Sequence, residues 1–367
     1  MCSATSARPS TGDAIDILES TRDYERWMAQ HIAVVRRDVR FKHARMAESS
    51  FVFLRGTFYR WMQRWPEVCA DLAGAPAVPC VGDLHVENFG TWRDAEGRLV
   101  WGVNDVDEAA RLPYANDLVR LATSAALATR HGHFRVSPRA SADAILEGYT
   151  AALERGGRAI VLAERRRWLR RIAFGRLRDP LNYWPRLTSL ATASGATPRD
   201  VLQAAMPDPK LPFRVARRVA GVGSLGRPRF VALADWRGAI IAREAKALLP
   251  SAAVWAARRQ SIDVNPEALL ARAVRCPDPF FCIDRGWIVR RLAPDCSRIE
   301  LQDLPRSRDE EKLLRAMGWE TANIHLGQRG PRIHPDLLSR PRRWLERAAA
   351  AMSHDVESDW QAWVHRR

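Results

Sequence analysis

The sequence of 367 residues contains very little lysine. Arginine supplies 54 of its 58 basic residues, which outnumber 42 acidic ones and give a formal net charge of +16. Charge carried by dispersed arginines, and not by lysine-rich tails, is weak evidence for nucleic-acid binding. Nucleic acid is therefore an alternative partner that the composition does not favour. The only lysines are Lys42, Lys210, Lys246 and Lys312.

Long apolar runs are missing as well. The longest uncharged apolar stretches, 121–129 and 247–257, are far shorter than the ~20 residues that a transmembrane helix needs. The N-terminal segment has no basic region followed by an apolar one. We therefore expect neither a membrane span nor a secretory signal.

Cysteine motifs are also absent. The six cysteines form no CxxC pair and have no Cys/His spacing suited to zinc. In a chain of this length we expect reduced, mostly buried thiols and a bacterial cytoplasmic location. No Ser-His-Asp or Cys-His arrangement for nucleophilic catalysis can be recognised.

The secondary structure that the sequence pattern predicts changes twice along the chain. Residues 1–13 are rich in Ser, Thr and Pro and are predicted to be disordered. Helical spacing of apolar residues dominates 14–206, a β-rich block follows at 207–305, and 306–367 returns to helix. This order predicts an α+β fold in which a large helical lobe is interrupted by a small β-rich lobe.

Local patterns predict individual elements within these blocks. We expect helices over 14–48 and 51–65, the second ended by Pro66, and short strands over 78–81 and 98–103.

Turn residues in the β-rich block mark two hairpins. One has its tip at 237–238, and the other joins strands over 280–283 and 287–292.

Polar side chains follow the two short strands of the helical lobe. Since neighbouring strands bring the groups beyond their ends together, we expect these side chains to form one cluster. Oxygen ligands from Asn and Asp suit Mg²⁺, and a further carboxylate could orient or deprotonate a hydroxyl group. The alternative is that the carboxylates cap loops and pair with arginines. The residues are Asp83, His85, Glu87 and Asn88 after the first strand, and Asp105, Asp107 and Glu108 after the second.

The segments GDLHVENFG (82–90) and VNDVDEA (103–109) resemble the catalytic and metal loops of aminoglycoside-phosphotransferase-like kinases, whose pattern is GDxHxxN followed by a strand ending in DxD. The resemblance implies that Asp83 is the catalytic residue. His85 occupies the histidine position of the motif, as a catalytic or a loop-bracing residue. Asp117 matches the residue that begins the next helix and braces the catalytic loop.

The same resemblance implies a metal site. Asn88 and Asp105 match the metal ligands, and Asp107 could add a further contact. The implied cofactors are ATP and Mg²⁺, with Mn²⁺ as an alternative ion.

A GxGxxG string, GVGSLG, lies in the β-rich block. A dinucleotide-binding unit would continue into a helix, but here Pro228 and β-type residues follow. Strand, glycine turn and strand is the arrangement that covers nucleotide phosphates in protein kinases, with a lysine on the third strand. The pattern therefore predicts nucleotide binding by Gly221, Gly223, Ser224 and Gly226.

Lys246 lies at the end of the strand that follows the 237–238 turn, and Arg243 precedes it by three residues. Both are candidates for the cation that contacts the nucleotide. A strand puts their side chains on opposite faces, so only one can do so. Glu267 and Glu300 are alternatives for the carboxylate that pairs with this cation.

In ordinary kinases the glycine loop precedes the catalytic loop, whereas here it follows, which suggests a circular permutation. The whole pattern resembles the uncharacterised bacterial domain-of-unknown-function family 2252, thought to be kinase-like, over roughly residues 40–365. The stretches that carry this resemblance include RMAESSFVFLRG (45–56), DLVRLATS, GVGSLG, AREAK and GWETANIH (318–325).

We therefore expect a two-lobed, protein-kinase-like fold and an ATP- and Mg²⁺-dependent phosphotransferase acting on a small-molecule hydroxyl or amine acceptor. The alternatives are a nucleotidyl transferase or inactive nucleotide-binding pseudokinase of the same fold, a metal-dependent phosphoesterase, and a basic nucleic-acid-binding protein. The arginine-rich segment 164–178 is a candidate surface for an acidic acceptor or nucleic acid.

Overall fold

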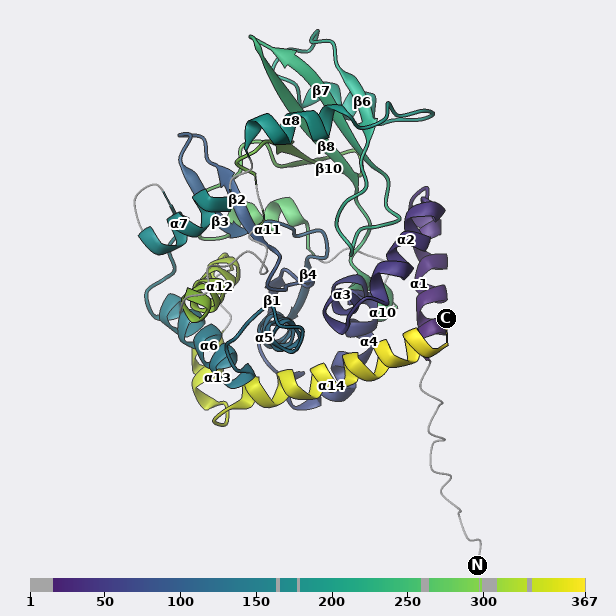
Figure 1. Ribbon diagram of the computed structural model, residues 1–367. Coiled ribbons are helices and arrows are strands. Elements are labelled where there is room, and N and C mark those ends of the chain that lie inside the picture. The colour runs from purple at the N-terminus through teal and green to yellow at the C-terminus, as the bar shows by residue number, and fades with distance from the viewer. Residues whose placement is uncertain are drawn as a thin grey trace, which may run out of the picture.

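The computed structural model describes residues 16–162, 166–176, 179–258, 264–296, 298, 309–328 and 332–366. Within these residues the fold is α+β, with a large body of helices and three small antiparallel sheets (Figure 1). The N-terminal segment 1–13, predicted to be disordered, lies outside the described residues.

The N-terminal region forms four helices where two were expected. The predicted helix over 14–48 is broken because Ile32 is extended, and the main-chain N–H of Val35 donates to the carbonyl of Gly226 at 2.9 Å. The predicted helix over 51–65 is broken at Thr57, and Pro66 lies inside the second part and does not end it. The helices are α1 (Ile17–His31), α2 (Arg36–Met46), α3 (Ser50–Gly56) and α4 (Phe58–Val68), followed by the short 3-10 helix η1 (Ala70–Leu72).

The two strands expected to be neighbours belong to different sheets. Strand β1 (Ala77–Cys80) pairs with β4 (Ala110–Pro113). Strand β3 (Leu99–Val103) pairs with β2 (Phe89–Arg93), and β5 (Ile160–Val161) lies on the other side of β3. The sequence pattern missed β2, which follows the loop that carries Asp83. Strand β3 pairs with β2 across the short turn that precedes β3. Closing so short a loop costs little entropy.

The third sheet has five antiparallel strands, and both predicted hairpins are confirmed in it. The first turns at Arg237 and Gly238, which both have positive φ, as a tight two-residue hairpin requires. The strand order is β6 (Arg214–Arg217), β7 (Arg229–Trp236), β8 (Ala239–Ala247), β10 (Trp287–Leu292) and β9 (Cys282–Asp284).

Helices that precede this sheet in the chain cover it. Side chains of α8 (Pro180–Thr188) pack with one apolar cluster of the sheet, and those of α9 (Arg199–Ala204) pack with the other. The packed unit therefore begins near residue 180, earlier than the expected boundary at 207. The following helices α10 (Ala252–Ala256) and α11 (Pro266–Arg272) contribute to the main core of the helical body instead. An apolar face of a sheet has to be covered by another element, and the sequence block alone did not show which helices cover this sheet.

The remaining helices build the body around α5 (Tyr114–Arg130). The C-terminal return to helix is confirmed, and α14 (Trp344–His365) runs along the body as far as α1 (Figure 1). These helices also include α6 (Pro138–Glu154), α7 (Arg167–Arg176), α12 (Asp309–His325) and α13 (Ile333–Ser339).

Close packing joins α6 to α12. A Cβ atom at Gly148 would lie 1.8 Å from the carbonyl oxygen of Arg315, and one at Gly318 would lie 2.0 Å from that of Ile145. Only glycine at both positions permits this approach of the two backbones. Across the described part of the chain, no helix combines the length and apolarity needed to cross a bilayer.

Candidate active site

Two acidic loops, residues 81–88 after β1 and 104–109 after β3, meet the glycine loop (221–226) at one cavity. The cavity lies between the five-stranded sheet and the helical body. The structure thus brings together most of the residues singled out from the sequence. The predicted residues that line the cavity are Asp83, His85, Asn88, Asp105, Asp107, Glu108, Gly221, Gly223 and Ser224.

Asp117 holds the loop that carries Asp83. Its carboxylate oxygens accept hydrogen bonds from the main-chain N–H groups of Val81 at 2.8 Å and Gly82 at 3.0 Å. Gly82 has a φ of 80°, and a Cβ atom there would lie 2.3 Å from the carbonyl oxygen of Glu108. The turn after β1 therefore needs both the carboxylate of Asp117 and a glycine, as the motif implies.

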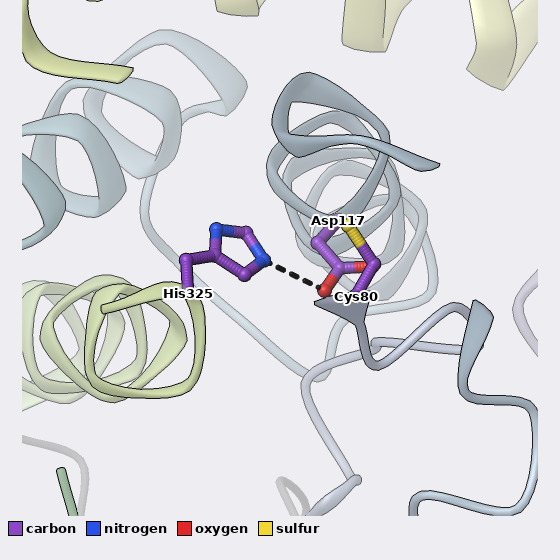
Figure 2. Close-up of side chains that lie close together, drawn as sticks. All are labelled: Cys80, Asp117 and His325. Carbon is purple, nitrogen blue, oxygen red and sulfur yellow. Dashed lines mark hydrogen bonds and ion pairs between the residues drawn. The ribbon is translucent and has the colours of Figure 1, made fainter. Parts of the chain in front are cut away.

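Asp117 is itself held by a buried neighbour (Figure 2). His325 Nε2 lies 3.2 Å from Asp117 Oδ2, and His325 Nδ1 lies 2.7 Å from the hydroxyl of Tyr149. Since a carboxylate only accepts hydrogen bonds, Nε2 carries a proton and donates to Asp117.

The potential ligand atoms of Cys80, Asp117 and His325 lie within 4.8 Å of one another (Figure 2). Such a trio could in principle hold a metal ion. Both oxygens of Asp117 already accept main-chain N–H groups, however. We therefore interpret the cluster as the brace of the loop that carries Asp83.

The carboxylate of Asp83 has one oxygen paired and one directed to the glycine loop. The fully buried Arg120 donates from Nε to Oδ1 at 2.9 Å, and its guanidinium lies over the rings of Phe58 and Trp61. A Cβ atom at Gly223 would lie 3.4 Å from Oδ2. Burial raises the pKa of Asp83, and the charge of Arg120 offsets part of that rise.

Asn88 lines the cavity and has a buried, unpaired oxygen. Its Nδ2 donates to the main-chain carbonyls of Asp83 at 3.1 Å and Asp105 at 2.9 Å, which sets the orientation of the amide. Its buried Oδ1 has no hydrogen-bond partner among the described residues. Buried polar atoms are rarely left without a partner, and an amide oxygen beside carboxylates suits a divalent cation.

The two aspartates beyond β3 are paired with a cation of β8 and with Arg227, which lies between β6 and β7. Lys246 Nζ donates to Asp105 at 2.9 Å and to Asp107 at 3.0 Å, and Arg227 donates to Asp107 at 2.7 Å. Burial by itself would raise the pKa of Asp105, but the charge of Lys246, the hydrogen bond with Asp107 and the charges of Arg290 and Arg298 together outweigh it and hold this pKa well below the ordinary value. Asp105 is therefore ionised at neutral pH. Asn88, Asp105 and Asp107 form a donor set that fits Mg²⁺.

His85 is buried beside these groups. Burial lowers its pKa well below the ordinary value, and the charges of Arg55 and Arg120 lower it further. Its Nδ1 accepts the N–H of Glu87 at 3.2 Å. The neutral ring therefore carries its proton on Nε2 and can donate from there.

The glycine loop packs closely on the N-terminal helices. Gly221 and Gly226 have positive φ, and a Cβ atom at Gly226 would lie 2.7 Å from the side chain of Val39 on α2. Ser224 accepts a hydrogen bond from Arg229 at 2.5 Å. Glycine is therefore needed at Gly226 both for its φ and for the contact with α2.

The two competing cations of β8 lie on opposite faces, as their spacing implies. Lys246 contacts the acidic loops, whereas Arg243 turns away, donates to the carbonyl of Ala205 at 3.0 Å and lies over the ring of Phe280. The structure thus does not bring Arg243 to the cavity. Of the two glutamates considered as partners of this cation, Glu267 is exposed at the start of α11, and Glu300 lies outside the described residues. The observed partners of Lys246 are two aspartates.

The sequence reasoning missed a buried charge cluster behind the glycine loop. Glu244 is fully buried and forms ion pairs with Arg218, Arg229 and Arg290. A signal was present, because Glu244 and Lys246 are two residues apart on one strand and therefore share a face.

A second cavity of about 190 Å³ adjoins the first, and the two share Gly221 and Arg298. Its lining is rich in arginine and includes two aromatic rings. The residues concerned are Arg218, Arg229, Arg290, Arg291, Arg298, Trp92 and Tyr183. No described residue of the arginine-rich α7 lines either cavity.

Residues 34–182 match the model of a bacterial family. Its description is "Uncharacterized protein conserved in bacteria (DUF2252)". The match covers both acidic loops but less than half of the chain. It ends before the first strand of the five-stranded sheet. The family resemblance seen in the sequence is thereby confirmed for this part, whereas the kinase-like reading and the permutation stay predictions. Neither a curated protein nor a solved structure matches the chain.

Proposed function

We propose that this chain is an ATP- and Mg²⁺-dependent phosphotransferase with a kinase-like fold in permuted order. The observation that carries the proposal is the meeting of Asn88, Asp105 and the glycine loop at one cavity, together with the buried Oδ1 of Asn88 that has no hydrogen-bond partner among the described residues. In the five-stranded sheet, the glycine loop joins the first two strands and Lys246 is on the third, which is the arrangement found in protein kinases.

Asn88 and Asp105 would hold Mg²⁺, with Asp107 as a further contact. The ion would neutralise charge on the nucleotide phosphates. Lys246 keeps the acidic pair in position through its hydrogen bonds of 2.9 and 3.0 Å. The shared low-dielectric environment strengthens these interactions.

Asp83 would act on the acceptor. Its Oδ2 is directed to the glycine loop, and its raised pKa makes it a better proton acceptor than an exposed aspartate. A bond forms between the acceptor oxygen or nitrogen and the γ-phosphorus, while the bond from that phosphorus to the oxygen bridging to the β-phosphate breaks. The acceptor proton passes to Asp83, and ADP leaves with the bridging oxygen.

The nucleotide would extend into the arginine-rich second cavity. That cavity combines positive charge with the rings of Trp92 and Tyr183, which suits a phosphorylated, aromatic ligand. The first cavity has a volume of about 40 Å³, less than a terminal phosphate needs together with a metal ion. Binding would therefore require the glycine loop to move away from Asp83, as in enzymes that close over a substrate.

Thermal unfolding with Mg²⁺ and ATP tests the proposal. A ligand that binds the folded chain raises its melting temperature, so the native chain should gain stability with ATP only when Mg²⁺ is present. Asp105→Ala should abolish this gain, whereas the matched control Asp235→Ala, at an exposed position of β7, should retain it. Absence of both a shift and calorimetric binding for the native chain would overturn the proposal.

Product analysis then separates the reactions open to this fold. Transfer of the γ-phosphoryl group with release of ADP supports a kinase, whereas release of pyrophosphate identifies nucleotidyl transfer. Binding without turnover for any acceptor identifies a pseudokinase.

A further inference from the structure

Lys42 is a buried ammonium group for which the proposed reaction has no role. It is on α2, and only 7% of its surface is exposed. Its Nζ donates to the carbonyl of Gly223 at 3.4 Å and lies 5.7 Å from the ring centroid of Tyr59. Within the described part of the chain, the ammonium forms no ion pair. An ammonium has three hydrogens to donate, so a single long hydrogen bond leaves it incompletely satisfied.

The other lysines lack this combination of burial and missing partners. Lys246 is also buried, but two aspartates neutralise it. Lys312 is half exposed and pairs with Asp309 at 3.1 Å, and Lys210 is exposed. An unpaired cation in the interior is costly unless an anion joins it. The position of Lys42 therefore calls for a negatively charged ligand.

Lys42 borders the cavity at the point where phosphoryl transfer would occur. It lines the same cavity as Asp83, and its hydrogen bond reaches the glycine-loop residue nearest to Asp83 Oδ2. The transferred group would have to pass between that loop and Asp83. Lys42 and Lys246 approach from different elements, α2 and β8, and only Lys246 is bonded to the acidic pair.

We propose that Lys42 binds the terminal phosphoryl group of the nucleotide and neutralises its charge during transfer. This role rests on the proposed phosphotransferase function. Lys246 and the metal ion serve the inner phosphates, and Lys42 supplies positive charge to the end that reacts. Its hydrogen bond to the Gly223 carbonyl also links the glycine loop to α2. The ammonium group and the loop would therefore both lie beside the terminal phosphoryl group.

The electrostatic surroundings agree with this role. Burial and the positive charge of Arg227 lower the pKa of Lys42, the charges of Glu25, Glu108 and Asp83 offset part of this effect, and the resulting pKa is about 8. The group is thus mostly charged at neutral pH and is easily deprotonated above it.

Comparison of Mg²⁺–ATP and Mg²⁺–ADP binding by calorimetry tests the proposal, because ADP lacks the group that Lys42 would contact. Lys42→Met should weaken ATP binding about tenfold or more, as expected for loss of a hydrogen bond to a charged group, and change ADP binding less than about twofold. Lys42→Arg should retain most of the preference for ATP. The matched control Lys312→Met should bind both nucleotides like the native chain.

The outcomes separate this role from the proposed function. If the native chain binds neither nucleotide, both proposals are overturned. If the native chain binds Mg²⁺–ATP and Asp105→Ala does not, but Lys42→Met weakens both nucleotides equally or neither, only the role of Lys42 is overturned.

A labelling experiment on the native chain avoids any variant that fails to fold. Acetic anhydride acetylates uncharged lysine amines, and the four lysines can be followed separately by peptide mass spectrometry. ATP should slow acetylation of Lys42 more than ADP does, with the exposed Lys210 and Lys312 as internal controls. Equal protection of Lys42 by the two nucleotides would overturn the contact with the terminal phosphate.

Discussion

Lys246 on β8 donates a hydrogen bond to Asp105, which lies beyond the end of β3, at a distance of 2.9 Å. The two residues are separated by 141 positions in the chain, and β8 and β3 belong to different sheets. This ion pair connects the five-stranded sheet to the acidic loop of the helical body. It also decides which of the two basic residues of β8 belongs to the site.

Lys246→Met and Arg243→Met should therefore have different effects. Lys246→Met leaves two partly buried carboxylates without their shared cation, so unfolding free energy should fall by about 3–5 kcal/mol and nucleotide affinity at least tenfold. Arg243→Met should leave nucleotide affinity within about twofold, since Arg243 contacts Ala205 and Phe280 on the other face. Urea unfolding and calorimetry measure the two quantities. A loss of nucleotide affinity in Arg243→Met but not in Lys246→Met would contradict the assignment of Lys246 to the site.

Gly223→Ala should displace the glycine loop. The added Cβ atom would lie 2.9 Å from the carbonyl oxygen of Arg55 and 3.4 Å from Asp83 Oδ2. Such overpacking costs about 1–3 kcal/mol, and we expect phosphoryl transfer to slow by about tenfold or more because the loop can no longer close next to Asp83 over the bound nucleotide. Gly74→Ala is the control, since a Cβ atom there meets nothing within 4 Å. Melting temperature and transfer rate should be measured together, and an unchanged rate would refute the close packing.

Asp83→Asn should separate catalysis from binding. The side chain keeps its shape but can no longer accept the acceptor proton, so phosphoryl transfer should fall by about 10²–10⁴-fold. Mg²⁺–ATP affinity should stay within about threefold, because Asp83 is not among the proposed metal ligands. Single-turnover transfer and calorimetry test this, with Asp235→Asn as the control. A variant that loses nucleotide binding and transfer together would show that Asp83 is a ligand.

The stability of the native chain should rise with pH relative to Lys42→Met. Burial holds the pKa of Lys42 at about 8, compared with 10.5 for an ordinary lysine, so between these values the unfolded chain binds more protons than the folded chain. Unfolding free energy therefore increases as pH rises from about 8 towards 10.5, by up to about 3 kcal/mol from this group. Urea unfolding at pH 7.5 and 9.5 measures the difference between the two proteins. Parallel pH dependence would mean that Lys42 has an ordinary pKa.

Local signals in the sequence were sufficient for many elements and for the composition of the site. The tight turn at Arg237 and Gly238 defines a hairpin, and the alternation of a strand separates Arg243 from Lys246. The acidic loops were recognisable because polar residues directly follow apolar strand segments. Each of these features depends on residues that are close in sequence, so their spacing carries the information.

The breaks in the N-terminal helices were not predictable in the same way. The turn after α1 forms where the main-chain N–H of Val35 donates to the carbonyl of Gly226, a residue of the glycine loop between β6 and β7. A periodic pattern reports which face of a helix is apolar, but it does not report a distant partner that competes for a main-chain N–H group. The pairing of β1 with β4 was missed for a related reason, because a strand segment by itself does not specify its neighbour.

The sequence by itself determined the identity of the candidate catalytic and metal-binding residues, the strand–glycine turn–strand unit and the scarcity of lysine. The tertiary structure alone decided that Lys42 and Lys246 reach the site from two elements, that Arg120 pairs with Asp83, and that Arg243 faces away. The physical reason is that motifs reflect local spacing, whereas the burial and pairing of a charge depend on segments that folding brings together from distant parts of the chain.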